Sequence, residues 1–151
     1  MYHDNSPMFN RYVRTKNKII YPWSLSIVDC FLLFRAFATI SSSDPVGMIR
    51  IWGGEGGEES LSISSAYSLY DVDTEAYGSE VVLIHRDSDS YCYWDLYERF
   101  VLASGSEQFI SLARPYPQDI EKHRYLEDMD ACGSERPEAI YEELVTMHRD
   151  S

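Results

Sequence analysis

The chain has 151 residues, of which 44% are hydrophobic and 14% aromatic, and its formal net charge at pH 7 is −12. This apolar content excludes a globally disordered chain, and the length corresponds to a single domain over residues 1–151 with one sizeable core. So anionic a chain is disfavoured for direct contact with nucleic acid or with an anionic membrane, because their phosphates would be repelled.

Cysteine usage and the longest apolar run bear on the compartment. Cys30, Cys92 and Cys132 are odd in number and widely spaced, which is typical of free thiols rather than of a disulfide framework. The first ten residues lack the apolar region of a secretory signal. The run Leu25–Ile40 is interrupted by charges and is shorter than a membrane span. We therefore expect a cytoplasmic protein.

The first third of the chain predicts a polar arm, a short strand and a helix. Residues 1–18 are polar and basic, and we expect a loosely ordered arm that enters a strand at Ile19–Tyr21. Pro22 fits the first turn of a helix over Leu25–Ile40, whose apolar residues recur on nearly every face and predict burial all round. The alternative is a core strand at Cys30–Phe34, but the uninterrupted length favours the helix.

The middle of the chain alternates apolar segments with turns rich in Gly, Ser and Asp. Four consecutive strands predict an antiparallel meander. The expected strands are Met48–Trp52, Ser60–Tyr70, Glu80–Arg86 and Tyr91–Trp94, separated by turns at Gly53–Glu59, Asp71–Ser79 and Asp87–Ser90, with a further turn at Ser41–Gly47 before the first.

Helical signals dominate the last third. Ser104 and Glu107 have capping-box spacing and open a short helix that must end at Arg114, before a proline. A second helix is expected over Gln118–Asp130, and a third begins near Pro137 with one apolar stripe. Strands in the middle and helices at both ends predict an α+β fold, an antiparallel β-meander of about four to five strands packed by helices on one face.

Motifs for catalysis, metals and cofactors are missing from the sequence. No closely spaced Cys or His pair announces a zinc site. Asp71, Asp73 and Glu75 alternate as at the start of an EF-hand calcium loop, but the sixth position needs Gly and holds Ala76. The glycine-rich segment Gly53–Glu59 carries acids where a phosphate-binding loop carries Lys. The sequence therefore predicts no metal, no cofactor and no enzyme.

The charge is unevenly distributed along the chain. Residues 1–50 hold six basic and three acidic groups, residues 51–100 hold two and eleven, and residues 101–151 hold five and eleven. The last two-thirds would therefore attract a basic partner and steer its approach. The alternative is that the acids only keep the protein soluble.

The acids of the middle third are the candidate site. In a meander, alternate loops emerge at the same end of the sheet, so the turn at Glu55 and the hairpin at Asp87 are expected to be neighbours around exposed tyrosines. An aromatic centre with a charged rim is typical of a protein-binding surface. The candidate partner-binding residues are Glu55, Glu58, Glu59, Tyr70, Asp71, Asp73, Glu75, Tyr77, Asp87, Asp89 and Tyr91.

These features lead to the hypothesis of a non-enzymatic inhibitory binding protein, a bacterial immunity protein (antitoxin) that neutralises a cognate toxin. A nuclease toxin must present Lys and Arg to phosphate, so an acidic surface can cover its active site. The first alternative is a phage-type anti-defence protein whose acids imitate the DNA backbone. The second alternative is an enzyme whose site residues are far apart in the sequence.

Overall fold

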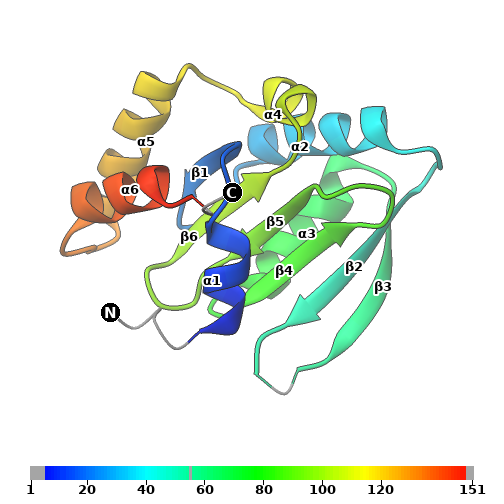
Figure 1. Ribbon diagram of the computed structural model, residues 1–151, viewed down its shortest axis with the longest axis horizontal. Coiled ribbons are helices and arrows are strands. Elements are labelled where there is room, and N and C mark those ends of the chain that lie inside the picture. Colours follow the sequence, from blue (N-terminus) through cyan, green and yellow to red (C-terminus); the bar gives the residue numbers. More distant parts are fainter. Residues whose placement is uncertain (1–5, 55, 149–151) are drawn as a thin grey trace.

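A computed structural model describes residues 6–54 and 56–148, which form six helices and six strands (Figure 1). The helices are α1 (Pro7–Val13), α2 (Ile27–Ile40), α3 (Ala66–Ala76), α4 (Glu107–Ala113), α5 (Gln118–Ala131) and α6 (Pro137–Thr146). The strands are β1 (Lys18–Pro22), β2 (Val46–Trp52), β3 (Glu58–Ile63), β4 (Val81–His85), β5 (Tyr91–Trp94) and β6 (Phe100–Ser104).

All six strands belong to one sheet with the order β1-β6-β5-β4-β2-β3, and every neighbouring pair is antiparallel. This confirms the predicted α+β class and the antiparallel sheet. The sheet is slightly larger than the four to five strands predicted, because Phe100–Ser104, for which no strand was predicted, forms β6 between β1 and β5.

Helices cover both faces of the sheet, whereas the sequence analysis placed them on one. Strand side chains alternate between two apolar clusters: Val81 and Leu83 of β4 face α2, α3 and α4, and Val82 faces α1, α5 and α6. In Figure 1, α1 crosses the near side of the sheet and α3 lies on the far side. Since the central strands are apolar on both faces, each face must be shielded from water.

The segment predicted as the clearest strand, Ser60–Tyr70, is half strand and half helix. β3 ends at Ile63, and Ser65 caps α3 by accepting a hydrogen bond from the Ser68 amide at 3.3 Å. Leu69, Val72 and Ala76 then form a buried stripe with helical spacing. The turn predicted at Asp71–Ser79 is wrong for the same reason, because the helix continues to Ala76.

Helix α3 changes the topology. It carries the chain back along the sheet, so β4 pairs with β2 on the side away from β3. The register aligns Trp52 with Val81 and Met48 with His85. The β2–β3 turn and the Asp87–Ser90 turn therefore lie at opposite ends of the sheet. The prediction that these two acidic turns are neighbours is wrong.

The N-terminal segment contains a packed helix where a loosely ordered arm was expected. Ser6 caps α1, and Phe9, Tyr12 and Val13 are buried against the sheet. Residues 1–5 lie outside the described part. The Lys18 ammonium group donates hydrogen bonds to carbonyl oxygens at the ends of α1 and α6, among them that of Met147 at 2.7 Å.

The predicted helix over Leu25–Ile40 is confirmed with two differences. It begins at Ile27 after a capping box between Ser26 and Asp29, while Pro22 ends β1. One of its faces is open, since the Phe31 side chain is 61% exposed, so burial all round is wrong. The three C-terminal helices lie close to their predicted positions, although Ser106 rather than Ser104 caps α4.

A buried ion pair links the helices of the two faces. Asp29 of α2 is 1% exposed and accepts two hydrogen bonds from the Arg124 guanidinium of α5, at 2.9 and 2.6 Å. The same carboxylate accepts a bond from the Ser26 amide at 2.8 Å. Asp29 therefore both caps α2 and fastens α5.

Replacing Asp29 with Ala should lower the free energy of unfolding by about 3–5 kcal/mol, because Arg124 loses its buried counter-charge and α2 loses its cap. Urea denaturation measures this change. Asp71→Ala, an exposed acid of α3, should alter stability by less than about 0.5 kcal/mol. Equal effects of the two substitutions would contradict the role given to Asp29.

Candidate functional site

The predicted site residues are spread over several elements of the fold. Glu55 is outside the described residues. The others are distributed as follows: Glu58 and Glu59 on β3; Tyr70, Asp71, Asp73 and Glu75 on α3; Tyr77 directly after α3; Asp87 and Asp89 in the β4–β5 turn; and Tyr91 on β5.

Asp73 supports the core instead of facing solvent. It is 5% exposed, and its Oδ1 accepts hydrogen bonds from the Leu25 amide at 3.0 Å and from Trp94 Nε1 at 2.8 Å. Burial raises the pKa of its carboxyl group, although both hydrogen bonds oppose the shift. A side chain in this position cannot reach a partner protein.

Glu59 and Glu75 are engaged by a cation of the chain itself. Arg50 of β2 lies 2.6 Å from Glu59 Oε1 and 2.5 Å from Glu75 Oε2. Trp52 Nε1 donates to Glu59 at 3.0 Å, and this bond together with Arg50 holds the pKa of Glu59 below its usual range. Arg50 partly neutralises these two carboxylates, so they attract an external cation less strongly than unpaired acids would.

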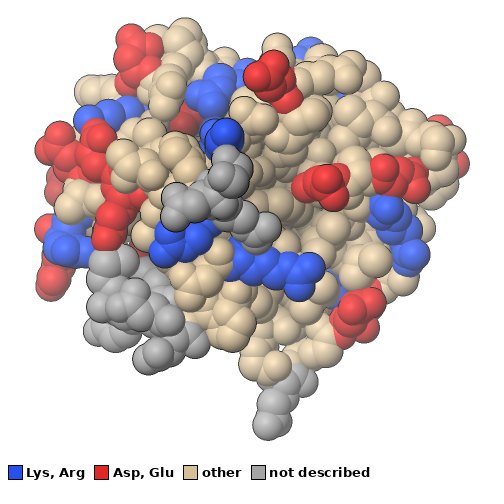
Figure 2. All heavy atoms as spheres, viewed as in Figure 1, with Lys and Arg blue, Asp and Glu red and all other residues tan. Residues whose placement is uncertain are grey.

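The largest group of exposed acids belongs to α5, α6 and the turn between them. Residues 118–146 contain nine acidic and three basic side chains. Figure 2 shows Asp and Glu gathered over these helices at the left of the view. We call this the acidic surface; its exposed members are Asp119, Glu127, Asp128, Asp130, Glu135, Glu138 and Glu142. The eleven acidic residues of 101–151 already indicated an anionic surface in this part of the chain, whereas the predicted site used the acids of residues 51–100.

A cavity of about 250 Å³, here called the aromatic pocket, lies at the end of the sheet where β5 turns into β6. Trp23, Tyr77 and Trp94 provide aromatic walls, and Asp95 and Arg99 provide charged groups. These residues come from the β1–α2 segment, the α3–β4 turn and the β5–β6 turn. Of the predicted site residues, Tyr77 lines this pocket.

Two residues of the pocket hold strained backbone conformations. Trp23 has φ of 31° and Arg99 has φ of 56°, values that side chains other than Gly rarely adopt. The guanidinium carbon of Arg99 lies 4.7 Å from the Trp23 ring centre, and the Trp23 and Tyr77 rings are 5.3 Å apart. Cation–π attraction and ring packing offset part of the strain.

A second, open cavity of about 720 Å³ joins the aromatic pocket to the acidic surface. Trp23 and Arg99 line both cavities, and the second cavity is also bordered by Glu98 and by Cys132–Arg136 of the α5–α6 turn. The aromatic pocket therefore adjoins the α5–α6 turn, where Glu135 is the member of the acidic surface that lines the second cavity, beside Arg136.

Asp95 is the most perturbed acid of this region. Its Oδ2 accepts a hydrogen bond from the Glu98 amide at 2.6 Å, and burial raises its pKa to about 6. The Tyr93 hydroxyl lies 3.0 Å from Asp95 Oδ1 and 2.7 Å from Glu80 Oε2. A phenol has one proton to donate, so both contacts become hydrogen bonds when one carboxyl group is protonated.

Metal sites and membrane-spanning helices were the two further features sought in the described residues. Within residues 6–54 and 56–148, no group of three or more His, Cys, Asp and Glu side chains is placed to hold a metal ion. None of the helices in this part of the chain is both long and apolar enough to cross a membrane.

No family model, curated protein sequence or solved structure matches this chain.

The raised pKa of Asp95 predicts a pH dependence of stability. Its folded-state pKa of about 6 exceeds the ordinary 3.8, so its contribution is complete below about pH 4 and is lost as the pH rises through 6. Relative to Asp95→Asn, the wild-type protein should lose about 2 kcal/mol of unfolding free energy between pH 4 and 7.

Urea titrations of both proteins at several pH values measure this difference. Asp95→Asn lacks the titrating group and is the reference for the wild-type curve. Parallel stability curves for wild type and Asp95→Asn would show that Asp95 titrates normally.

Proposed function

We propose that the protein is a non-enzymatic inhibitory binding protein, specifically a bacterial immunity protein that neutralises a cognate nuclease toxin in the cytoplasm. The observation that supports this proposal is that the acidic surface adjoins the aromatic pocket, since Glu135 lines the cavity that shares Trp23 and Arg99 with that pocket. It replaces the arrangement expected from the sequence, in which the acids of the β-turns formed the binding surface.

Electrostatic complementarity is the first argument. A nuclease concentrates Lys and Arg in its active site to hold phosphate, so its cleft attracts a surface carrying exposed carboxylates. Such attraction accelerates association, which matters for an inhibitor that must act before the toxin cleaves nucleic acid. Lys122 lies between two of these acids, 2.5 Å from Glu142 and 3.7 Å from Glu138, and most of the other acids extend into solvent.

The aromatic pocket supplies the second argument. Charged rims set rate and specificity, whereas buried aromatic contacts carry most of the affinity of tight complexes. Trp23 and Tyr77 are packed against each other and Arg99, so a partner side chain that enters the pocket meets a rigid aromatic wall. An apolar or aromatic side chain of the toxin fits this chemistry, because the Arg99 guanidinium already lies over the Trp23 ring and would repel a second cation.

The test is a charge-reversal experiment with the product of the open reading frame next to this gene as the toxin. Replacing Glu127, Asp130 and Glu135 together with Lys should weaken binding at least about 100-fold and abolish protection of the host, because three attractions become repulsions. Surface plasmon resonance and a growth assay measure the two effects. All three side chains are exposed, so thermal unfolding should change little.

A matched triple variant reverses Glu58, Asp71 and Asp87, three exposed acids from the originally predicted site. It should retain protection. Loss of protection in this variant alone would place the toxin on the other acids and overturn the acidic surface as the binding site. Inhibition of several unrelated DNA-binding proteins would replace the immunity assignment with mimicry of the DNA backbone.

A further inference from the structure

A third cavity lies at the opposite end of the sheet from the aromatic pocket and differs from it in charge. This open groove of about 900 Å³ runs between α1 and the β4–β5 turn. We call it the basic groove. It is lined by Arg11, Tyr12, Arg14, Thr15, Lys16, Ile40, Ile84, Ser88, Asp89, Ser90, Tyr91, Ser104, Gly105 and Ser106. Two predicted site residues, Asp89 and Tyr91, thus border a groove that is mainly cationic.

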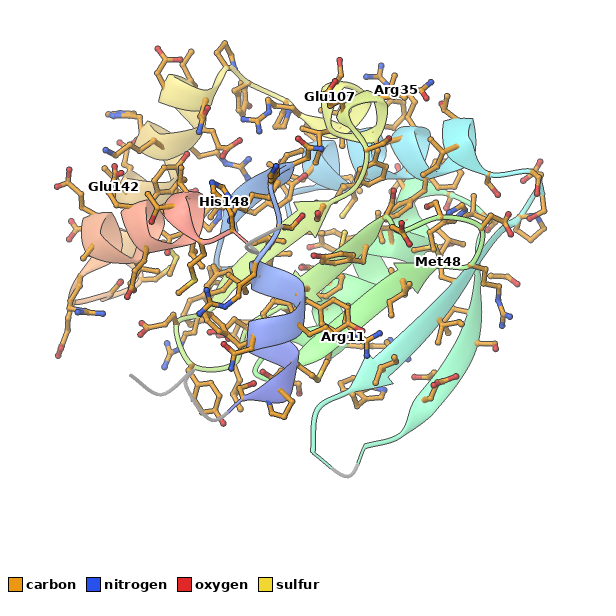
Figure 3. The ribbon with its side chains drawn as sticks, viewed as in Figure 1. Arg11, Arg35, Met48, Glu107, Glu142 and His148 are labelled. Carbon is orange, nitrogen blue, oxygen red and sulfur yellow. The ribbon has the colours of Figure 1, made fainter. Side chains whose placement is uncertain are left out.

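Three cations stand against one carboxylate in the lining. Arg11, Arg14 and Lys16 are all exposed, and within the described residues no ion pair engages Arg14 or Lys16. Figure 2 shows Lys and Arg side chains in the centre of the view, over α1. In Figure 3, Arg11 extends from α1 across the near face of the sheet. An anion is attracted here despite the net charge of −12.

Hydroxyl groups form the floor of the groove, and their hydrogen bonds fix their orientation. Ser104 donates to the Asn17 carbonyl at 2.8 Å, so Thr15 is the donor in its 2.8 Å contact with Ser104. Ser106 accepts from the Phe109 amide at 3.1 Å, which leaves its own proton for a further acceptor.

The missing side chain of Gly105 allows its backbone to lie close to Ser90 and Phe109. A Cβ atom at residue 105 would lie 2.5 Å from Ser90 Oγ and 2.7 Å from the Phe109 ring. The strand end therefore passes close to the β4–β5 turn, and the hydroxyl groups of the two segments line one groove.

The opposite wall of the groove is apolar and aromatic. The half-buried Tyr91 ring packs edge-on against Tyr12 at 5.0 Å, and the Tyr91 hydroxyl donates to the Tyr12 carbonyl at 2.6 Å. Ile84 packs in the same apolar cluster as these rings, and Ile40 also lines the groove. A rigid ring beside cations suits a ligand that carries both a flat ring and an anionic group.

We propose that the basic groove binds a small phosphate monoester with a ring-bearing organic group, a mononucleotide being the chemical class that fits. Arg14 and Lys16 hold the phosphate, Ser106 donates to it, and the ring lies against Tyr91. The volume falls in the usual range of small-molecule sites. A nucleic acid strand is disfavoured, because its further phosphates would run into the field of a strongly anionic protein. This assignment is independent of the proposed toxin inhibition.

Isothermal titration of the full-length protein with adenosine 5′-monophosphate and guanosine 5′-monophosphate is the test. At least one of them should bind with a dissociation constant below about 1 mM, and Arg14→Ala/Lys16→Ala should weaken this binding at least about tenfold. Tyr91→Leu should weaken it as well. Arg35→Ala removes an equally exposed cation on α2, labelled in Figure 3, and should leave binding unchanged.

Amide chemical shifts of Thr15, Ser90 and Gly105 locate the ligand, and circular dichroism shows whether each variant is folded. Absence of heat and of shift changes at 5 mM of either nucleotide would overturn the proposal, as would binding that survives loss of Arg14 and Lys16. Equal affinity for inorganic phosphate would remove the ring from the assignment, and equal affinity for adenosine would remove the phosphate. If a single-stranded oligonucleotide binds more tightly than either mononucleotide, the ligand of the groove is nucleic acid and the proposal is overturned.

Discussion

The architecture depends on one constraint: the central strands β4, β5 and β6 are apolar on both faces. In β6, Val101 and Ala103 face one cluster while Phe100 and Leu102 face the other, so neither side can be left in water. Three helices cover each side, and the Asp29–Arg124 pair joins the two groups at the edge of the sheet. The Lys18 ammonium group, whose pKa burial lowers to about 8, holds the ends of α1 and α6 beside β1.

The crossover through α3 gives the two ends of the sheet different chemistry. Because the chain returns along the sheet before β4, the turns that follow β1 and β5 gather at one end with the α3–β4 turn and build the aromatic pocket. The β4–β5 turn and the end of α1 meet at the other end and build the basic groove. One end of the sheet therefore presents aromatic rings, and the other presents cations and hydroxyl groups.

The two proposed sites carry charges of opposite sign, although the net charge of the chain is −12. The proposed toxin surface uses the excess carboxylates of α5 and α6, and the proposed phosphate site uses the basic residues of the N-terminal third. The strain at Trp23 and Arg99 belongs to the first site, where cation–π attraction holds a wall shared by two cavities. Both sites are built from turns supported by the rigid sheet.

The sequence by itself determined the α+β class, the antiparallel sheet, the helices near Leu25–Ile40, Gln118–Asp130 and Pro137, and the anionic character of the chain, because composition and local periodicity carry that information. It misassigned Ser60–Tyr70, since alternating apolar residues ran from β3 into α3 and masked the cap at Ser65. Only the tertiary structure decided which acids are exposed: Asp73 is buried and Arg50 pairs with Glu59 and Glu75, while α5 and α6 keep most of theirs in solvent. It also decided the three cavities, because each is lined by segments far apart in the chain, and which segments meet depends on strand order, a long-range property that no local pattern encodes.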